Sequence, residues 1–404
     1  MNSGTGTAWN EGQAPTSMRA VVWTRYGPPE GLVLRSVRRP VPSSHEVLIG
    51  VHATGVAAGD CELRALRFSL GLRIFVRLLM GLARPRDKIL GQEFAGVVRD
   101  VGTGVTRFQP GDRVYGTTGF RFGAYAEYLC LSEHAGGGAL AKTPVHLRDD
   151  EAATVPTGAL EALHFFRRAG DLRGAKVLIN GAGGGIGIFA VQLAKLYGAD
   201  VTAVDGPTKR DLLRSLGADQ ILDYTREEFA RSAESYDVIF DVIGKTSYTS
   251  TLGRLTPDGY YLLGNPRVST MLRGIWTSCT SRRTVVFGAA RQSSEDLAQL
   301  RELLDSGQLR TVVDRTFPLE DAAEAHRYFE TGAARGRVVL LVRSEQRPGE
   351  PGREAGKLGE VRRGTAPVPT VPEPGDSPGG NSAREARSGV AGELANVVEL
   401  DLAP

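Results

Sequence analysis

Cysteine is scarce in this chain of 404 residues, which contains only three copies far apart in sequence. Cys61, Cys130 and Cys279 form no pair at CxxC spacing, which argues against a disulfide framework and against a clustered cysteine metal site. This scarcity is typical of proteins from a reducing compartment, so we expect a cytoplasmic protein.

Strong charge of one sign and long apolar runs are also lacking. The formal net charge is +3, too small for this length to indicate a nucleic-acid partner. We find no transmembrane segment, and residues 1–17 are rich in Gly, Thr and Ser without the apolar core of a signal peptide. We therefore expect a globular protein with a disordered leader over residues 1–17.

The end of the chain has no Phe, Tyr or Trp between Glu345 and Pro404. Its composition shifts to Pro, Gly, Glu and Arg, and such a segment cannot bury enough apolar area to offset the entropy of ordering it. The sequence predicts a disordered tail over residues 345–404.

Between these ends, the chain changes its pattern once. From Arg19, short runs rich in Val, Leu and Ile are cut by Gly and Pro, which predicts short strands joined by turns. After Glu151, strands alternate with helices, which is typical of a parallel, doubly wound α/β sheet. Within this half we expect strands at 175–180, 200–204 and 283–289 and helices at 188–198 and 209–217; a final strand is expected at 336–342.

One stretch of the first half differs from its surroundings. Residues Arg64 to Lys88 are apolar and basic at roughly helical spacing, and Pro85 would end any helix there. The helix could press on a membrane surface. We favour the alternative, a partly buried helix that lines a substrate mouth while its arginines reach water. On this interpretation the substrate would be bulky and hydrophobic.

A glycine-rich loop follows the first strand of the second half, in the segment KVLINGAGGGIGIFAVQLAK. Gly181, Gly184 and Gly187 are three residues apart, directly after a strand and before a helix, which is the context of a dinucleotide-binding turn. Gly181 permits the sharp exit from the strand, and Gly187 lets the helix pack closely on the sheet. The backbone at Gly184, Gly185 and Ile186 would then approach the pyrophosphate at the helix N-terminus. A purely structural turn is the alternative, but strand, spacing and helix together favour a cofactor.

The end of the second strand bears on the choice between NAD and NADP. Asp205 stands where an acid commonly hydrogen-bonds the adenosine ribose of NAD. Thr208 and Lys209 follow within one turn, and a lysine there could pair with the ribose phosphate of NADP. Because Asp205 precedes Gly-Pro and could point away, whereas Lys209 opens the next helix, we favour NADP(H) over NAD(H).

Further motifs extend along the chain: RYGPPEGLVL, EVLIGVHATGVAAGD, LGQEFAGVV, FQPGDRVYG, GAYAEYL, LGADQILDY, FDVIG and GRVVLLV. Together with the glycine loop, they make residues 18 to about 343 resemble the medium-chain dehydrogenase/reductase superfamily, in its zinc-independent quinone oxidoreductase-like branch. The resemblance implies a GroES-like β-barrel catalytic domain over 18–148, completed by 290–344, and a Rossmann NAD(P)-binding domain over 149–289.

The resemblance also implies cofactor contacts beyond the glycine loop. Tyr224 would lie beside the adenosine phosphate with Lys209. The remaining contacts would come from strand ends near the nicotinamide: Asp241, Val242, Gly264, Asn265, Phe287 and Gly288. Each of these residues could instead simply close a strand.

The residues at the family's zinc positions do not suit a metal. Ala57 and Gln92 stand where the zinc-dependent branch has a cysteine and a histidine, and no cysteine occurs in VPTGALEAL. Zinc binds thiolate, imidazole or carboxylate, so we expect no zinc. Asp60 and Glu93 match residues that support the zinc ligands in those relatives and could still order the cleft.

The resemblance implies hydride transfer from NADPH to a quinone, an enone or another carbonyl, since no metal would polarise an alcohol. Asp60 and Arg64 are the best catalytic candidates, although the two could equally form a structural ion pair. Two departures weaken the inference: relatives often have Asn in place of Ala57 and Thr in place of Glu161.

Two other functions stay open. One is a metal-free alcohol dehydrogenase. The other is a catalytically idle protein that senses NADPH or binds RNA or a membrane partner. The resemblance further implies a homodimer formed through the edge strand near Val285 and Val286.

Overall fold

The computed structural model describes residues 16–342, apart from 69, 87 and 135–136. The predicted tail and all but the last two residues of the predicted leader lie outside the described residues. Ser17, the last residue of that leader, already belongs to strand β1.

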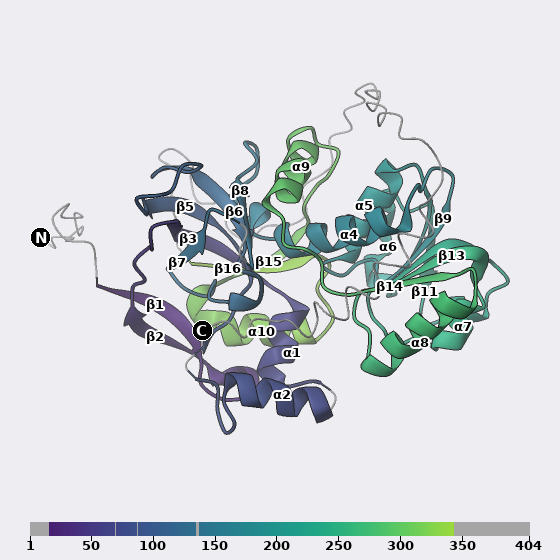
Figure 1. The fold of residues 1–404 in the computed structure, drawn as a ribbon, viewed down its shortest axis with the longest axis horizontal. Helices are drawn as coiled ribbons and strands as arrows, with labels where there is room; N and C mark the ends of the chain where they lie inside the picture. The colour runs from purple at the N-terminus through teal and green to yellow at the C-terminus, as the bar shows by residue number, and fades with distance from the viewer. Residues whose placement is uncertain (1–15, 69, 87, 135–136, 343–404) are drawn as a thin grey trace, which may run out of the picture. The chain divides into compact units, whose positions relative to one another are not determined.

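A seven-stranded sheet, largely antiparallel, forms most of the first half within the described residues (Figure 1). Its strand order is β15-β16-β3-β5-β6-β8, and β7 pairs with β3. The bounds are Glu46–Val56 (β3), Glu93–Val101 (β5), Arg113–Thr117 (β6), Tyr128–Ser132 (β7), Ala139–Lys142 (β8), Val313–Pro318 (β15) and Arg337–Leu341 (β16). Strand β16 runs antiparallel to β3, so the end of the described chain returns to the sheet of the first half.

A smaller sheet adjoins it, with the order β2-β1-β4. Its bounds are Ser17–Trp23 (β1), Leu32–Arg38 (β2) and Lys88–Ile89 (β4).

The second half contains the predicted parallel sheet, with the order β11-β10-β9-β12-β13-β14. Its bounds are Lys176–Asn180 (β9), Asp200–Asp205 (β10), Gln220–Asp223 (β11), Tyr236–Asp241 (β12), Leu255–Leu263 (β13) and Thr284–Phe287 (β14). Val177 and Ile179 of β9 enter one apolar cluster and Leu178 enters another, so both faces of the sheet are covered. This confirms the doubly wound α/β prediction.

The helices of the described chain are α1 Ala58–Ala65, α2 Leu70–Met80, α3 Asp149–Ala152, α4 Pro156–Ala169, α5 Gly187–Leu196, α6 Arg210–Ser215, α7 Tyr248–Leu252, α8 Val268–Thr280, α9 Ser294–Asp305 and α10 Ala322–Glu330. Helices α4 and α5 pack on the parallel sheet through fully buried aromatic rings, among them Phe165, Phe189 and Phe240. These rings give the glycine loop, which lies between β9 and α5, a rigid support.

The basic apolar stretch forms α2, but the helix ends earlier than Pro85 would require. Gly81 follows Met80 with φ 125°, a left-handed conformation that favours glycine and ends the helix. No residue of α2 is buried, and Val76, Arg77 and Met80 are half-buried. The expected partly buried helix is therefore far more exposed than we predicted. No helix in the described part of the chain is long and apolar enough to cross a membrane.

Candidate functional site

The candidate site lies at the carboxyl ends of the parallel strands. The strand registers pair Asp205 with Asp223, Asn180 with Asp241, and Leu263 with Phe287, which brings these strand ends level at one edge of the sheet. This edge, next to the turn between β9 and α5, is where open α/β sheets bind their ligands.

The glycine loop has the geometry predicted for it. Gly181 adopts φ 88°, so the chain leaves β9 through a left-handed turn. A Cβ at Gly187 would overlap the carbonyl oxygen of Gly181, so helix α5 can begin this close to the strand only with glycine there. Ile186 is the residue before α5, and the positive end of that helix faces the loop.

A cavity of about 620 Å³ opens beside this loop. Five of the predicted cofactor residues line it: Gly181, Gly184, Asp205, Lys209 and Tyr224. Residues that sequence reasoning did not select also line it, among them Asn180, Phe229, Lys245, Thr246, Ser247 and Gly332. Gly332 follows α10, in the segment that returns to the seven-stranded sheet of the first half; we call this sheet and its helices the barrel half. Both halves of the chain therefore contribute to this cavity.

Asp205 does not point away from the loop, and this part of our argument for NADP was wrong. Its carboxylate accepts hydrogen bonds from the amides of Gly183 (2.7 Å) and Gly206 (2.8 Å). The Lys209 ammonium lies 3.4 Å from the same carboxylate, and both side chains are largely shielded from water. Thr208 is exposed and is not among the residues that line the cavity. Asp205 therefore orders the glycine loop, and Lys209 is held close to it.

The side chain of Asp241 is turned into the protein. Its carboxylate is fully buried and accepts hydrogen bonds from Asn180 Nδ2 (2.8 Å), the Gly244 amide (2.9 Å) and Tyr261 Oη (3.2 Å). Its role in this structure is to fix the turn after β12, which includes Val242. Ile243 and Lys245 of the same turn line the cavity.

The predicted contacts farther along the sheet are at the ends of β13 and β14. The amide of Gly264 donates to the carbonyl oxygen of Asp241 (3.0 Å), so the turn that contains Asn265 lies against the turn after β12. Phe287 ends β14, and Gly288 follows it with φ 130°. Gly264, Asn265, Phe287 and Gly288 do not line the cavity. Toward β13 and β14, its lining ends with Ser247, which follows β12.

A buried arginine next to the glycine loop was missed by the sequence argument. Arg337, on β16, forms an ion pair with the buried Glu93 on β5. A Cβ at Gly185 would overlap its guanidinium, so the arginine lies against the loop, and its Nε has no hydrogen-bond partner in the described chain. Glu93 also accepts from the Thr157 amide (3.0 Å) at the start of α4. The arrangement places a buried cation against the glycine loop.

Asp60 belongs to a buried network of polar side chains that ends at His326 and Cys61. Its carboxylate accepts hydrogen bonds from the amides of Ala57 (3.2 Å) and Gly91 (3.1 Å) and from Tyr125 Oη (3.3 Å). Tyr125 also contacts His326 Nε2 (3.1 Å), whose Nδ1 lies 3.3 Å from Cys61 Sγ. Burial raises the pKa of Asp60 to about 7, against the lowering effect of the backbone donors.

His326, at the other end of this network, carries no charge at neutral pH. Burial, together with nearby Arg64, lowers the pKa of His326 to about 3. The hydroxyl of Tyr125 joins the two ends through its contacts with Asp60 and His326.

Arg64 is not paired with Asp60. Its guanidinium donates to Glu330 (2.5 Å) on α10 and to the carbonyl oxygen of Gly27, and the side chain is almost fully buried. The structural ion pair that we considered for Asp60 and Arg64 is thus formed by Arg64 with a different acid. Arg64 connects α1 to α10.

Glu161 is a shielded carboxyl group on α4. Burial alone raises its pKa to about 7, and no charged group or hydrogen bond opposes this shift. The same helix contacts the glycine loop one turn earlier, because a Cβ at Gly158 would overlap the carbonyl oxygen of Gly185. The unusual glutamate therefore lies on the helix that supports the loop.

The positions of the family's catalytic zinc do not fit a metal in this chain. Ala57 has no donor atom, and the side-chain amide of Gln92 donates to the carbonyl oxygen of Gly119 (3.0 Å). Asp60 has its oxygens occupied by three donors. We derive no step through a metal at this place.

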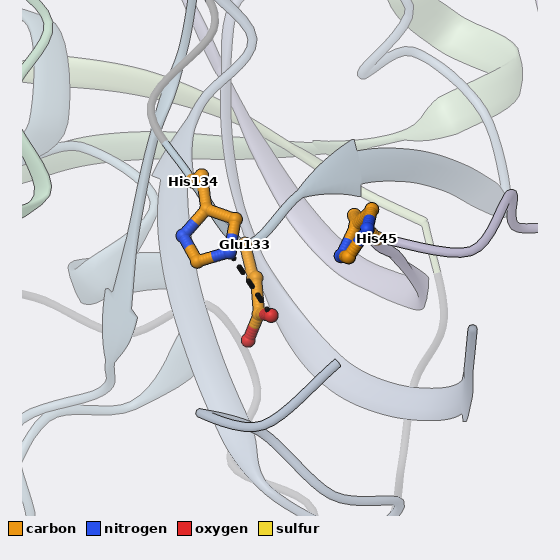
Figure 2. A group of neighbouring side chains, drawn as sticks. All are labelled: His45, Glu133 and His134. Carbon is orange, nitrogen blue, oxygen red and sulfur yellow. Dashed lines mark ion pairs between the residues drawn. The ribbon is translucent and has the colours of Figure 1, made fainter. Parts of the chain in front are cut away.

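Three side chains of types that can bind a metal lie together in the first half of the chain, next to β3 and β7. Figure 2 shows His45, Glu133 and His134, whose ligand atoms all lie within 4.8 Å of one another. Glu133 is buried, and its carboxylate accepts from the amides of Thr106 and Arg107, whereas both histidines are exposed. None of the three lines the cavity beside the glycine loop.

Two family models match the chain. The model described as "Alcohol dehydrogenase GroES-like domain" matches residues 43–144, and the model described as "Zinc-binding dehydrogenase" matches residues 216–340. The first covers most of the first half. The second begins after β10 and covers the rest of the parallel sheet and the segment that returns to the first half.

Named proteins match over most of the described chain. NAD(P)H oxidoreductase RTN4IP1, mitochondrial, from Mus musculus is 32% identical over 81% of this chain and 90% of its own length. The 2-methylene-furan-3-one reductase of Solanum lycopersicum is 30% identical over 81% of this chain and 79% of its own. The solved structure of the quinone oxidoreductase from Coxiella burnetii has a TM-score of 0.72 at 29% identity and covers 81% of this chain and 100% of its own.

Proposed function

The chain belongs to the medium-chain dehydrogenase/reductase superfamily, in its quinone oxidoreductase-like branch, and on this premise we propose that it is a zinc-independent, NADPH-dependent reductase of quinones, enones or other carbonyls. The observation that carries the proposal is the glycine loop, with Arg337 against it, at the edge of a cavity that also contains Lys209. These residues fit a dinucleotide: glycine where a Cβ would collide, and buried or shielded cations where phosphates would lie.

A nicotinamide bound there would supply the hydride. The chain itself would supply orientation and exclude water, since the loop is backed by buried aromatic rings and the Glu93–Arg337 pair. Asp60 has three donors on its buried carboxylate, and this favours a positioning role over direct contact with substrate. Arg64 is bound to Glu330, which favours the same role.

We keep NADP(H) as the favoured cofactor, for a revised reason. Lys209 and Tyr224 line the cavity together. The Asp205 carboxylate, which also pairs with Lys209, accepts from two backbone amides. An acid that binds its own backbone is a poorer acceptor for ribose hydroxyls, whereas a lysine can pair with a ribose phosphate.

Titration with NADPH and NADH in parallel tests the cofactor preference. Lys209→Ala should weaken NADPH binding by roughly tenfold or more, about the value of one charge-assisted contact, and leave NADH binding nearly unchanged. Lys195→Ala is the matched control, because Lys195 pairs with Asp219 and does not line the cavity. Equal losses for both cofactors would remove the NADP preference.

A panel of acceptors tests the reaction. We expect NADPH consumption with a test quinone or an enone and little oxidation of simple alcohols by NADP⁺. Turnover of alcohols alone would favour the metal-free alcohol dehydrogenase. Tight NADPH binding with no turnover of any acceptor would favour the idle sensor.

The remaining proposals concern assembly and location. Strand β14, which contains Val285 and Val286, is the last strand of its sheet in the described chain, and we propose that two copies join there into a homodimer. A monomer mass by light scattering would contradict this. We also propose a cytoplasmic location, on the sparse cysteines alone; fractionation of cells that produce the protein would test it.

A further inference from the structure

The outward half of helix α2 is apolar. At 100° per residue, Val76, Arg77 and Met80 share the side that faces the protein. The other sides of the helix carry apolar side chains that are between 44% and 72% exposed: Leu70, Leu72, Ile74, Phe75, Leu78 and Leu79. A surface helix normally has the opposite pattern, with its apolar stripe toward the core. Leu82, 66% exposed, continues this apolar face past the end of the helix.

The helix is fixed in this orientation. Tyr26 Oη donates to the carbonyl oxygen of Gly81 (2.6 Å), and the Arg77 guanidinium lies 5.3 Å from the centre of the Tyr26 ring. Val76 and Met80 pack against the apolar cluster of the barrel half. The contacts that hold α2 therefore all use one side, and the exposed apolar face is the opposite side.

The surroundings of this face are positively charged. The sequence has six arginines and no acid between Glu62 and Asp87. Arg64 and Arg67 pair with Glu330. Arg77 faces the protein, so three arginines remain to flank the apolar face. Arg73, Arg84 and Arg86 are exposed, and none of them forms an ion pair with another described residue. The apolar face is thus flanked by cations with no acidic partner on the same stretch.

We propose that helix α2 and the following residues up to Arg86 dock on the surface of an anionic phospholipid bilayer. An exposed apolar face flanked by arginines is the chemistry that enters the boundary between headgroups and acyl chains and holds lipid phosphates. A second copy of this chain fits less well, because a twofold contact through this face would bring the arginines of both helices together. The proposal is independent of the reductase function.

Co-sedimentation of the full chain with lipid vesicles tests the proposal without any turnover assay. We expect binding to vesicles of equal parts phosphatidylglycerol and phosphatidylcholine, and much weaker binding to pure phosphatidylcholine. Leu79→Asp should lower the partition by about tenfold or more, since it removes an apolar anchor. Leu272→Asp on α8 is the matched control, because Leu272 is 62% exposed and Leu79 is 60% exposed.

A charge variant separates electrostatic attraction to anionic headgroups from burial of the apolar face in the bilayer. Arg84→Gln with Arg86→Gln should weaken binding to the anionic vesicles by roughly fivefold per arginine and leave the residual binding to phosphatidylcholine unchanged. Circular dichroism should show that every variant keeps the fold.

Three outcomes would overturn the proposal. The first is no binding to anionic vesicles, and the second is equal losses for Leu79→Asp and Leu272→Asp. The third concerns a protein that fails to bind vesicles. In that case Leu79→Asp would change the oligomeric mass or the Michaelis constant for long-chain acceptors. That third result would show that a second copy or the substrate covers the face.

Discussion

Arg337 and Glu93 form a buried ion pair that joins the returning strand β16 to β5, next to Gly185 of the glycine loop. The two residues are separated by 244 positions in the sequence. The pair therefore connects the closing segment of the barrel half to the loop of the other half.

Removal of one partner of this pair should be costly. Arg337→Met leaves Glu93 buried without its cation, and we expect a loss of about 3–5 kcal/mol in the free energy of unfolding. Adding Glu93→Gln to the same chain should recover a large part of that loss, because no charge then stays buried alone. Urea denaturation of the two single variants and the double variant measures both effects. Additive losses would show that the two side chains do not interact.

The same arginine shows where sequence reasoning stops. The glycine loop and the parallel strands follow from local patterns: apolar runs, glycine spacing and the alternation of strand and helix. The Glu93–Arg337 pair and the contact of Cys61 with His326 join residues more than two hundred positions apart. A single sequence records no such pairing, so Arg337 and His326 were not identified.

Asp205 shows a second limit. Its position at the end of β10 was predicted, but the direction of its side chain was not, because that direction depends on the amide of Gly183 in another loop. The exposed face of α2 is a third case, since helical spacing of apolar residues does not say whether a core lies beside them.

Asp205→Ala should weaken both cofactors rather than one. The substitution removes the acceptor of the Gly183 amide, so the glycine loop loses a hydrogen bond that orders it, worth about 1.5–3 kcal/mol when the acceptor is charged. We expect the Kd values of NADPH and NADH to rise by similar factors in isothermal titration. A selective loss of NADH binding would instead mean that the carboxylate binds the ribose.

Metal removal should leave the reductase activity unchanged. Ala57 offers no donor and the Gln92 amide is bound to Gly119, so these two residues do not suit zinc at the family's catalytic position. Dialysis against a chelator, followed by an assay with quinone and NADPH, measures this. Elemental analysis needs His45→Ala beside it, since zinc held by the exposed histidines of Figure 2 would otherwise be counted. Loss of turnover on chelation, restored by zinc in the His45→Ala variant, would contradict the expectation.

Glu161 should make the protein less stable at and above neutral pH than at pH 4.5. The pKa of its carboxyl is about 7 in the folded chain against an ordinary value of 4.5. Between these values the unfolded chain has already released the proton that the folded chain keeps, so the free energy of unfolding falls as pH rises from about 4.5 to 7. Above pH 7 the full penalty remains, up to about 3 kcal/mol for a shift of this size.

Glu161→Gln removes the titrating group and keeps the shape of the side chain. We therefore expect the variant to be more stable than the natural chain at pH 8 and nearly equal to it at pH 4.5, as measured by urea denaturation at both values. Glu302→Gln, on the exposed side of α9, is the control and should change stability little at either pH. If Glu161→Gln gave the same change at both pH values, the carboxyl would not be desolvated, and its place on the helix that supports the glycine loop would have no electrostatic consequence.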